Sequence, residues 1–295
     1  MDIPRSYKLS LNGHTLELGN HTAIMGIVNV TPDSFSDGGN FFSHNKAVEH
    51  GEKMADEGAD IIDIGGESTR PFSEAISVEE ESQRVVPVIE KLAKRINIPI
   101  SIDTTKADVA IKAIEAGAAM INDISALRFD ENMAAVAKKY DAPLILMHML
   151  GTPGTMQHSP EYDDLISEIR IFLEKAIQTA EKKGVPRSKV IIDPGIGFGK
   201  TVNHNYQLID NLDALNSLDV PILIGPSRKA FIRNTLKNEN ETDVKPDSPL
   251  VETGTQAAIA ASILKGAHIV RVHDVANTKI TVKIIDAVRN SANIP

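Results

Sequence analysis

The sequence of 295 residues contains no cysteine and no tryptophan, and aromatic residues make up only 4% of it. Without cysteine, the chain forms no disulfide, uses no thiolate in catalysis and holds no cysteine-ligated zinc or iron–sulfur cluster. No apolar run approaches the roughly 18 residues of a membrane helix, and the first residues lack the basic and apolar regions of a signal peptide. We therefore expect no membrane partner and a cytoplasmic location.

Positive charge is also in short supply, because 31 Lys and Arg face 40 Asp and Glu, which gives a net charge of -9. Proteins that bind nucleic acids cluster Lys and Arg against the phosphates, so we expect no nucleic-acid partner. An anionic ligand would need a local basic cluster. Hydrophobic residues at 42% are ordinary for a globular protein, and no Gly-, Ser- or Pro-rich linker divides the chain. We expect a single domain over residues 1–295.

Eight short apolar runs rich in Ile, Val and Leu recur along the chain, at 23–30, 60–65, 98–103, 119–123, 143–147, 190–193, 221–225 and 268–272. Helical stretches between them predict right-handed βαβ units, and eight such units predict closure into a (β/α)8 TIM barrel over 22–291. Before them, residues 7–19 alternate around Asn12-Gly13, which predicts an N-terminal β-hairpin that caps the barrel floor. Helices are predicted at about 45–57, from Ser77 onward, 105–116, 131–140, 162–183, 203–216, 228–237, 253–265 and 278–291.

Each apolar run ends in a polar residue: Asn29, Asp63, Asp103, Asn122, His148, Asp193, Ser227 and Arg271. In a parallel α/β fold the carboxyl ends of all strands lie at one face, so we expect these side chains to converge on one pocket. For Asp103 and Asp193 a helix N-cap is the structural alternative. For His148, between two methionines, the favoured interpretation is a core histidine whose hydrogen bonds are satisfied.

Two long loops and one basic cluster surround this rim. The loops at 31–39 and 66–73 are predicted to be lids, and Arg70 could either clamp an anion or pair with Glu67. Phe198 follows Asp193 among three glycines and could cover a planar ring. The basic segments GPSRK at 225–229 and RVHD at 271–274 follow the last two strands, where barrels of this kind often bind phosphate. Arg228 alone could instead pair with a surface acid, and no histidine spacing fits zinc.

The motifs MGIVNVTPDSFSDGG, GGESTRP, SIDT, INDI, LMHM with GTPGTMQ, DPGIGFGK, GPSRK and RVHDV run in this order over nearly the whole chain. Together they closely resemble the dihydropteroate synthase family. The resemblance implies condensation of 6-hydroxymethyl-7,8-dihydropterin pyrophosphate with p-aminobenzoate, which gives 7,8-dihydropteroate and pyrophosphate in folate biosynthesis. It also implies a homodimer, Mg2+ as cofactor, two small-molecule substrates and a sulfonamide target.

Matched motif by motif, the resemblance implies a site for each group of the substrates. The pterin pocket falls on Asp103, Asn122, Asp193 and Lys229, with Asp63 behind them. The pyrophosphate site falls on Asn29, Arg271 and His273, with Mg2+ on Asn29. The p-aminobenzoate site falls on Thr69, Arg70, Pro71, Phe198, Ser227 and Lys229. We assign the chemistry to Asp103, Lys229, Arg271, His273 and Arg70, and we favour a dissociative, SN1-like route in which the pterin delocalises the cation.

Three positions depart from the usual family pattern, namely Phe72, Leu150 and Arg233. They bear on the second-substrate site and on its response to sulfonamides. Two other functions are compatible with the same fold: a methyltetrahydrofolate:corrinoid methyltransferase, and a pterin-binding module without catalysis. The first would not need SRK and RVHD, and the second would be expected to lack Asn29, Arg271 and His273.

Overall fold

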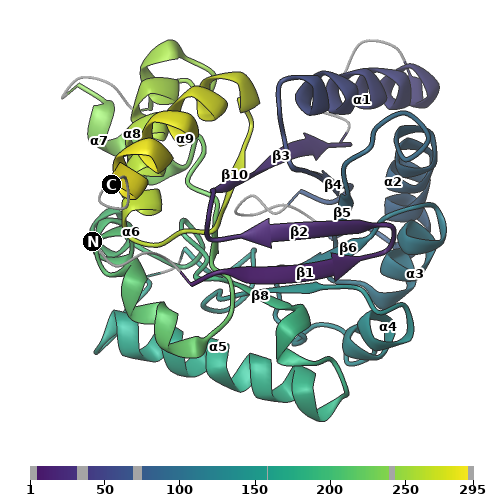
Figure 1. The fold of residues 1–295 in the computed structure, drawn as a ribbon, viewed down its shortest axis with the longest axis horizontal. Coiled ribbons are helices and arrows are strands. Elements are labelled where there is room, and N and C mark those ends of the chain that lie inside the picture. The colour runs from purple at the N-terminus through teal and green to yellow at the C-terminus, as the bar shows by residue number, and fades with distance from the viewer. Residues whose placement is uncertain (1–4, 32–38, 69–74, 158, 239–242, 292–295) are drawn as a thin grey trace.

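The eight apolar runs form parallel strands that wrap into a barrel surrounded by helices (Figure 1). The computed structural model describes residues 5–31, 39–68, 75–157, 159–238 and 243–291. The barrel strands are β3 (Ala23–Asn29), β4 (Ile61–Gly65), β5 (Ile100–Asp103), β6 (Met120–Asp123), β7 (Leu144–Met147), β8 (Val190–Asp193), β9 (Leu223–Ile224) and β10 (Ile269–Val272). Their order is β8-β7-β6-β5-β4-β3-β10-β9. A parallel bridge between Ile192 and Ile222 joins β8 to the start of β9 and completes the ring, so the predicted barrel is confirmed.

Alternation along each strand separates two cores. On β4, Ile62 and Ile64 belong to the large apolar cluster between strands and helices, whereas Ile61 belongs to a second cluster inside the barrel. Asp63 has the same parity as Ile61 and therefore also points inward, one layer closer to the carboxyl end. Parity turns these polar side chains toward the inside of the barrel. Because they stand at the carboxyl ends of parallel strands, they lie at one mouth of the barrel.

The N-terminal hairpin closes the opposite mouth. Strands β1 (Tyr7–Leu11) and β2 (His14–Leu18) pair antiparallel, with Leu11 opposite His14, and Gly13 supplies a φ of +75° in the connecting turn. The hairpin leucines join the cluster inside the barrel, and Figure 1 shows the hairpin lying across the end of the barrel. The predicted hairpin over 7–19 and its place at the barrel floor are confirmed.

The helices are α1 (Gly39–Asp56), α2 (Val78–Leu92), α3 (Ala107–Glu115), α4 (Met133–Lys139), α5 (Leu165–Lys182), α6 (Val202–Asp210), α7 (Ala230–Leu236), α8 (Pro249–Leu264) and α9 (Val275–Asn290). Within the described residues, no helix is both long enough and apolar enough to cross a membrane. Ser77 caps α2 as predicted, since its side chain accepts a hydrogen bond from the Glu80 N–H.

Several predicted helix limits were wrong. The prediction of one helix over 203–216 fails because α6 ends at Asp210 and the chain continues as a 3-10 helix over Leu212–Leu218. Helix α8 begins four residues before the predicted start at 253. The Ser248 side chain accepts from the Val251 N–H, and Pro249 occupies the first turn, where its missing N–H costs nothing. Helix α1 also begins earlier than predicted, at Gly39.

Candidate active site

Five of the predicted polar residues line one cleft at the carboxyl mouth of the barrel. They come from β5, β6, β8, the loop after β9, and β10: Asp103, Asn122, Asp193, Lys229 and Arg271. Ile124, Met147, Ile196 and Phe198 form the apolar part of the lining. The cleft therefore combines acids, an amide, two cations and an apolar wall that a flat heterocycle could contact.

Arg271 connects two carboxylates inside the mouth. Its Nε donates to Asp63 Oδ2 at 2.6 Å, and its Nη2 donates to Asp103 Oδ2 at 2.7 Å. Asn122 Nδ2 also donates to Asp63 Oδ2, at 3.0 Å. Asp63 is fully buried behind these groups, and its Oδ1 has no partner among the described residues. The predicted position of Asp63 behind the pocket is therefore what the structure shows.

The two carboxylates share one positive charge, and burial acts on the pKa of Asp103 more strongly than this charge does. Burial raises the pKa of Asp103 to about 7, because Arg271 offsets only part of the desolvation and the Asp63 charge opposes ionisation. Burial alone would lower the pKa of Arg271, but the two neighbouring carboxylates outweigh it and raise that pKa. The guanidinium therefore stays charged, while Asp103 can exchange a proton near neutral pH.

Asp193 and Lys229 lie on the other side of the cleft. Asp193 Oδ1 accepts from the Gly195 N–H at 2.7 Å, and burial raises the pKa of Asp193. Burial lowers the pKa of Lys229, although the Asp193 charge counteracts it. The Lys229 Nζ lies 3.8 Å from the centre of the Phe198 ring. A cation over an aromatic face is attractive, so Phe198 holds the ammonium in place and walls one side of the site.

The loop after β9 joins the end of β10 through Ser227. The Ser227 hydroxyl lies 3.0 Å from His273 Nδ1 and accepts from the His273 backbone N–H at 3.3 Å. Arg228, between Ser227 and Lys229, adopts a left-handed backbone with φ of +59° and pairs with Glu252 at 3.6 Å. The predicted pairing of Arg228 with an acid is confirmed, but the acid is not on the surface, because the Glu252 side chain is only 14% exposed.

His148 is a core residue. It is 4% exposed, its ring meets Phe172 edge-on at 4.8 Å, and its Nδ1 lies 3.0 Å from Lys200 Nζ. Burial and the nearby Lys200 charge lower its pKa to about 2, so the ring is neutral. Its Nδ1 then accepts a hydrogen bond from the Lys200 ammonium. In the sequence, Lys200 is the last residue of the DPGIGFGK motif, and no role is predicted for it. The sequence signal for a structural role was the position of this lysine, directly after a buried strand and a glycine-rich loop.

A second charge cluster, which is partly buried, joins Glu67 after β4 to the start of α2 and to Lys106. Lys106 Nζ donates to Glu67 Oε2 and to Glu81 Oε2, both at 2.6 Å, and Glu67 Oε1 accepts from the Ile76 N–H at 3.0 Å. Glu81 is fully buried, although it belongs to the acidic first turn of α2. Both Glu67 oxygens thus have partners other than Arg70.

Part of the predicted site lies outside the described residues. This applies to Thr69, Arg70, Pro71 and Phe72, and to most of both predicted lid loops. Asn29 ends β3 and pairs in register with Gly65, at the same mouth as the other site residues. Among the described residues, no group of three or more His, Cys, Asp or Glu could hold a metal by itself.

The other two departures from the family pattern, Leu150 and Arg233, lie within the residues that the structure describes. Leu150 is 38% exposed and lies against the glycine loop, where a Cβ on Gly199 would come within 2.7 Å of its Cβ. Arg233 donates from Nη1 to the Arg228 carbonyl at 2.9 Å and pairs with Asp243 through Nε at 3.0 Å. Arg233 therefore braces the strained backbone beside Ser227.

Comparison with known proteins places this site in a family. Residues 25–273 match the family described as pterin binding enzyme. A dihydropteroate synthase of Synechocystis is 47% identical over 276 residues, which is 93% of each chain. The Yersinia pestis dihydropteroate synthase, solved with a sulfonamide drug complex, superposes with a TM-score of 0.88 at 42% identity and covers 96% of this chain and 99% of its own.

The dihydropteroate synthase of Xanthomonas albilineans, solved with 4-aminobenzoic acid, gives the same TM-score of 0.88 at 42% identity and covers 99% of this chain and 100% of its own. The fold and the cleft thus define a pterin-binding barrel. At this identity and coverage, the chain belongs to the dihydropteroate synthase family.

Proposed function

We propose that this chain condenses 6-hydroxymethyl-7,8-dihydropterin pyrophosphate with p-aminobenzoate to give 7,8-dihydropteroate and pyrophosphate. One observation carries the proposal: Asp103, Asn122, Asp193, Lys229 and Arg271, from five segments of the chain, line one cleft at the carboxyl mouth of the barrel. Relatives of similar length that bear the dihydropteroate synthase name, one of them solved with 4-aminobenzoic acid, support the assignment.

The acidic side of the cleft suits the pterin. A pterin presents an amino group and a ring N–H side by side, and one carboxylate can accept from both. Asp193 Oδ1 is occupied by the Gly195 N–H, whereas its Oδ2 accepts no hydrogen bond from the described residues. Asn122 donates to Asp63 and so presents its amide oxygen in a fixed direction. Lys229 can donate to the ring carbonyl and N5 of the pterin.

The cationic side suits the leaving group. In our proposal Arg271 and His273 bind the pyrophosphate, and Arg271 turns part of its hydrogen bonding from Asp63 and Asp103 toward the phosphate oxygens. Asn29 offers one hard oxygen ligand, which fits Mg2+ because this ion keeps several waters and takes its other ligands from phosphates. When bound, Mg2+ would supply positive charge to the departing pyrophosphate.

The p-aminobenzoate site is proposed between Phe198, Ser227 and Lys229, together with Thr69, Arg70 and Pro71 of the loop after β4. The Phe198 ring gives an aromatic face, and Ser227 and Lys229 supply donors for a carboxylate. A neutral arylamine is already a sufficient nucleophile, so the enzyme needs no strong base and gains rate by positioning. Asp103, which faces the cleft, stabilises the pterin cation as the carbon–oxygen bond breaks.

The test is an assay of both products. The purified chain is incubated with the pterin pyrophosphate, p-aminobenzoate and Mg2+, and dihydropteroate and pyrophosphate are measured together. We expect equimolar products, and we expect Arg271→Ala to lower turnover and pyrophosphate affinity by about 100-fold or more, as loss of a transition-state charge partner does. Methyl transfer to a corrinoid without dihydropteroate would overturn the proposal in favour of the methyltransferase. Pterin binding without product would favour the module without catalysis.

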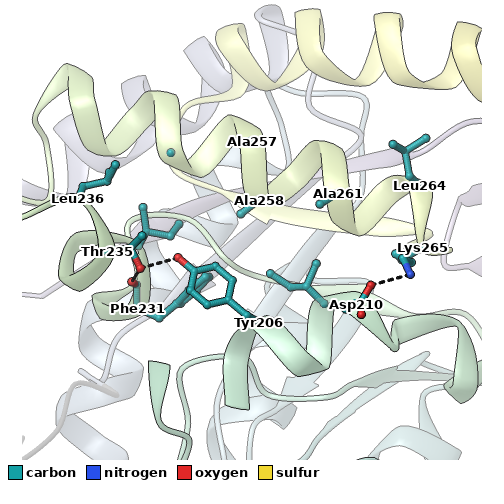
Figure 2. A pocket seen from close by; sticks show the side chains of 13 residues that line it. Tyr206, Asp210, Phe231, Thr235, Leu236, Ala257, Ala258, Ala261, Leu264 and Lys265 are labelled. Atoms are coloured by element: carbon teal, nitrogen blue, oxygen red, sulfur yellow. Dashed lines mark hydrogen bonds and ion pairs between the residues drawn. The ribbon is translucent and has the colours of Figure 1, made fainter. Parts of the chain in front are cut away.

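We also propose that the chain forms a homodimer through a groove between α6, α7 and α8. The groove has a volume of about 540 Å³, and Figure 2 shows Ala257, Ala258 and Ala261 of α8 along it, with Tyr206 and Asp210 of α6 at its other side. Ala257 and Ala261 are exposed, so small side chains leave room for the helix of a second copy.

Light scattering after gel filtration tests the dimer. We expect Ala261→Glu to convert a dimer into a monomer, because it places a charge in an apolar interface. The matched change Ala135→Glu, at an exposed alanine of α4, should leave the dimer intact. A wild-type chain that elutes as a monomer at micromolar concentration would refute this proposal. The cytoplasmic location stays a prediction of the sequence.

A further inference from the structure

Lys200 is a buried lysine whose hydrogen bonds all go to groups within the protein. The residue is 4% exposed, and its Nζ lies 3.0 Å from His148 Nδ1, 2.9 Å from the Gly195 carbonyl oxygen and 3.0 Å from the Phe198 carbonyl oxygen. An ammonium has three donors, and here each has one acceptor. Among the described residues, no carboxylate lies within 4 Å of it. Burial without an ion pair is costly, and it lowers the pKa of Lys200 to about 7.

The two carbonyls that Lys200 holds belong to the loop between β8 and α6. This loop carries positive φ angles at Gly195, Gly197 and Gly199, of +70°, +80° and +61°. Glycines lose more conformational freedom on folding than any other residue, so such a loop does not hold its shape unaided. The Phe198 N–H closes a turn onto the Gly195 carbonyl at 3.1 Å, and Lys200 binds that same oxygen and the next carbonyl after the turn.

Other side chains hold the rest of the loop. Asn205 accepts from the Gly197 N–H at 2.6 Å, Gln157 donates to the Gly197 carbonyl at 2.9 Å, and Tyr162 donates to the Gly199 carbonyl at 2.8 Å. Lys200 differs from these residues because it binds the carbonyl of Phe198 itself, together with the Gly195 carbonyl onto which the Phe198 N–H closes. The Phe198 ring is the one that lies under the Lys229 ammonium. The ring position therefore depends on the ammonium behind it.

We propose that Lys200 is a positioning residue for the second substrate, which acts by fixing the glycine loop so that Phe198 faces the p-aminobenzoate site. This inference rests on the proposed function, because the p-aminobenzoate site is part of that function. Lys200 does not contact the substrates. Its removal should loosen Phe198 and weaken p-aminobenzoate binding, with less effect on the pterin side, where Asp193 keeps its own bond to the Gly195 N–H.

Lys189 provides a matched control at the opposite end of the barrel. Its Nζ also makes three bonds, to the Ser10 and Asp141 carbonyls and to the Asp141 carboxylate, at 2.7, 2.9 and 2.8 Å. Lys189→Met therefore removes the same kind of support from segments far from the site. We expect Lys200→Met to raise the KM for p-aminobenzoate about tenfold and to change kcat and the KM for the pterin pyrophosphate less than threefold. Lys189→Met should change none of the three.

A spectroscopic readout separates positioning from general destabilisation. The chain has eight phenylalanines, and labelling them with 4-fluorophenylalanine gives a fluorine signal for Phe198 that Phe198→Leu identifies. We expect Lys200→Met to shift or broaden this signal and Lys189→Met to leave it unchanged. If Lys200→Met does not fold, Lys200→Gln, which keeps two donors, should fold and show a smaller rise in the same KM.

Two results would overturn the inference: an unchanged Phe198 signal with an unchanged KM for p-aminobenzoate, or an equal loss in all three kinetic constants. The wild-type assay keeps this failure distinct from that of the proposed function. A wild-type chain that makes dihydropteroate while Lys200→Met resembles wild type would refute only the role of Lys200.

Discussion

Replacement of Arg271 by methionine should destabilise the protein in a way that depends on pH. Arg271 is the shared cation between Asp63 and Asp103, at 2.6 and 2.7 Å. Without it, the two buried carboxylates lose their shared cation, and only the more distant charge of Lys229 still acts on Asp103. Breaking a buried pair by removing one partner typically costs about 3–5 kcal/mol, much more than the pair itself contributes.

The sign of the pH dependence follows from Asp103. Burial already raises its pKa to about 7, and the loss of Arg271 raises it further. A carboxyl with a raised pKa binds more protons in the folded chain than in the unfolded one, so stability falls as pH rises from the unfolded pKa toward the folded value. Each unit of pKa shift corresponds to about 1.4 kcal/mol. Wild-type Asp103 itself titrates near 7, so the two proteins diverge only over the last unit up to pH 8. We therefore expect the variant to lose about 1 kcal/mol more, relative to wild type, at pH 8 than at pH 5.5.

Urea unfolding followed by circular dichroism measures this effect, since the chain has no tryptophan to report by fluorescence. Arg95→Met is the matched control, because Arg95 pairs with Glu52 at 3.2 Å on the surface. A surface pair contributes about 1 kcal/mol or less, so this control should lose little stability and lose it equally at both pH values. The reasoning fails if Arg271→Met loses no more than Arg95→Met, or if its loss is the same at pH 5.5 and pH 8.

Three further changes test the loops at the mouth. Gly195→Ala would place a Cβ 1.8 Å from a backbone oxygen at a φ of +70°, whereas Gly13→Ala at +75° meets nothing within 4 Å. A left-handed backbone alone costs about 1–2 kcal/mol, so we expect Gly195→Ala to lower the Tm at least twice as much as Gly13→Ala in calorimetry, and equal shifts would contradict this. Phe198→Ala removes the ring 3.8 Å from the ammonium of Lys229 and should raise the KM for p-aminobenzoate about tenfold, while Phe198→Tyr keeps the ring and should change it little. Arg233→Ala removes the bond that braces the loop after β9 and should raise the same KM about threefold in steady-state assays, and no change would show that the brace is dispensable.

The barrel could be predicted from the sequence because a buried parallel strand needs a continuous apolar run and a polar end. The runs at 60–65 and 190–193 illustrate this, since both became strands that end at the mouth. Helix limits were less predictable. A helix start depends on which side chain caps it, and the cap of α8 is Ser248, five residues before the predicted start at 253.

The identity of the rim residues was also predictable, but their connections were not. The parity of each strand assigns Asp63, Asn122 and Arg271 to the inside of the barrel. Which of them touch depends on register between strands that are distant in sequence, so the sharing of Arg271 by Asp63 and Asp103 appeared only in the structure. Lys200 was missed for the same reason, because its acceptors include His148, 52 residues away.

By itself, the sequence determined the alternation of strands and helices, the hairpin, the chemical types at the barrel mouth and the resemblance to a family, since these depend on local pattern. Only the tertiary structure decided the protonation tendency of Asp103, the core role of His148 and the support of the glycine loop by Lys200. These properties come from burial and from contacts between distant segments. Desolvation acts on a group only after the chain has closed around it.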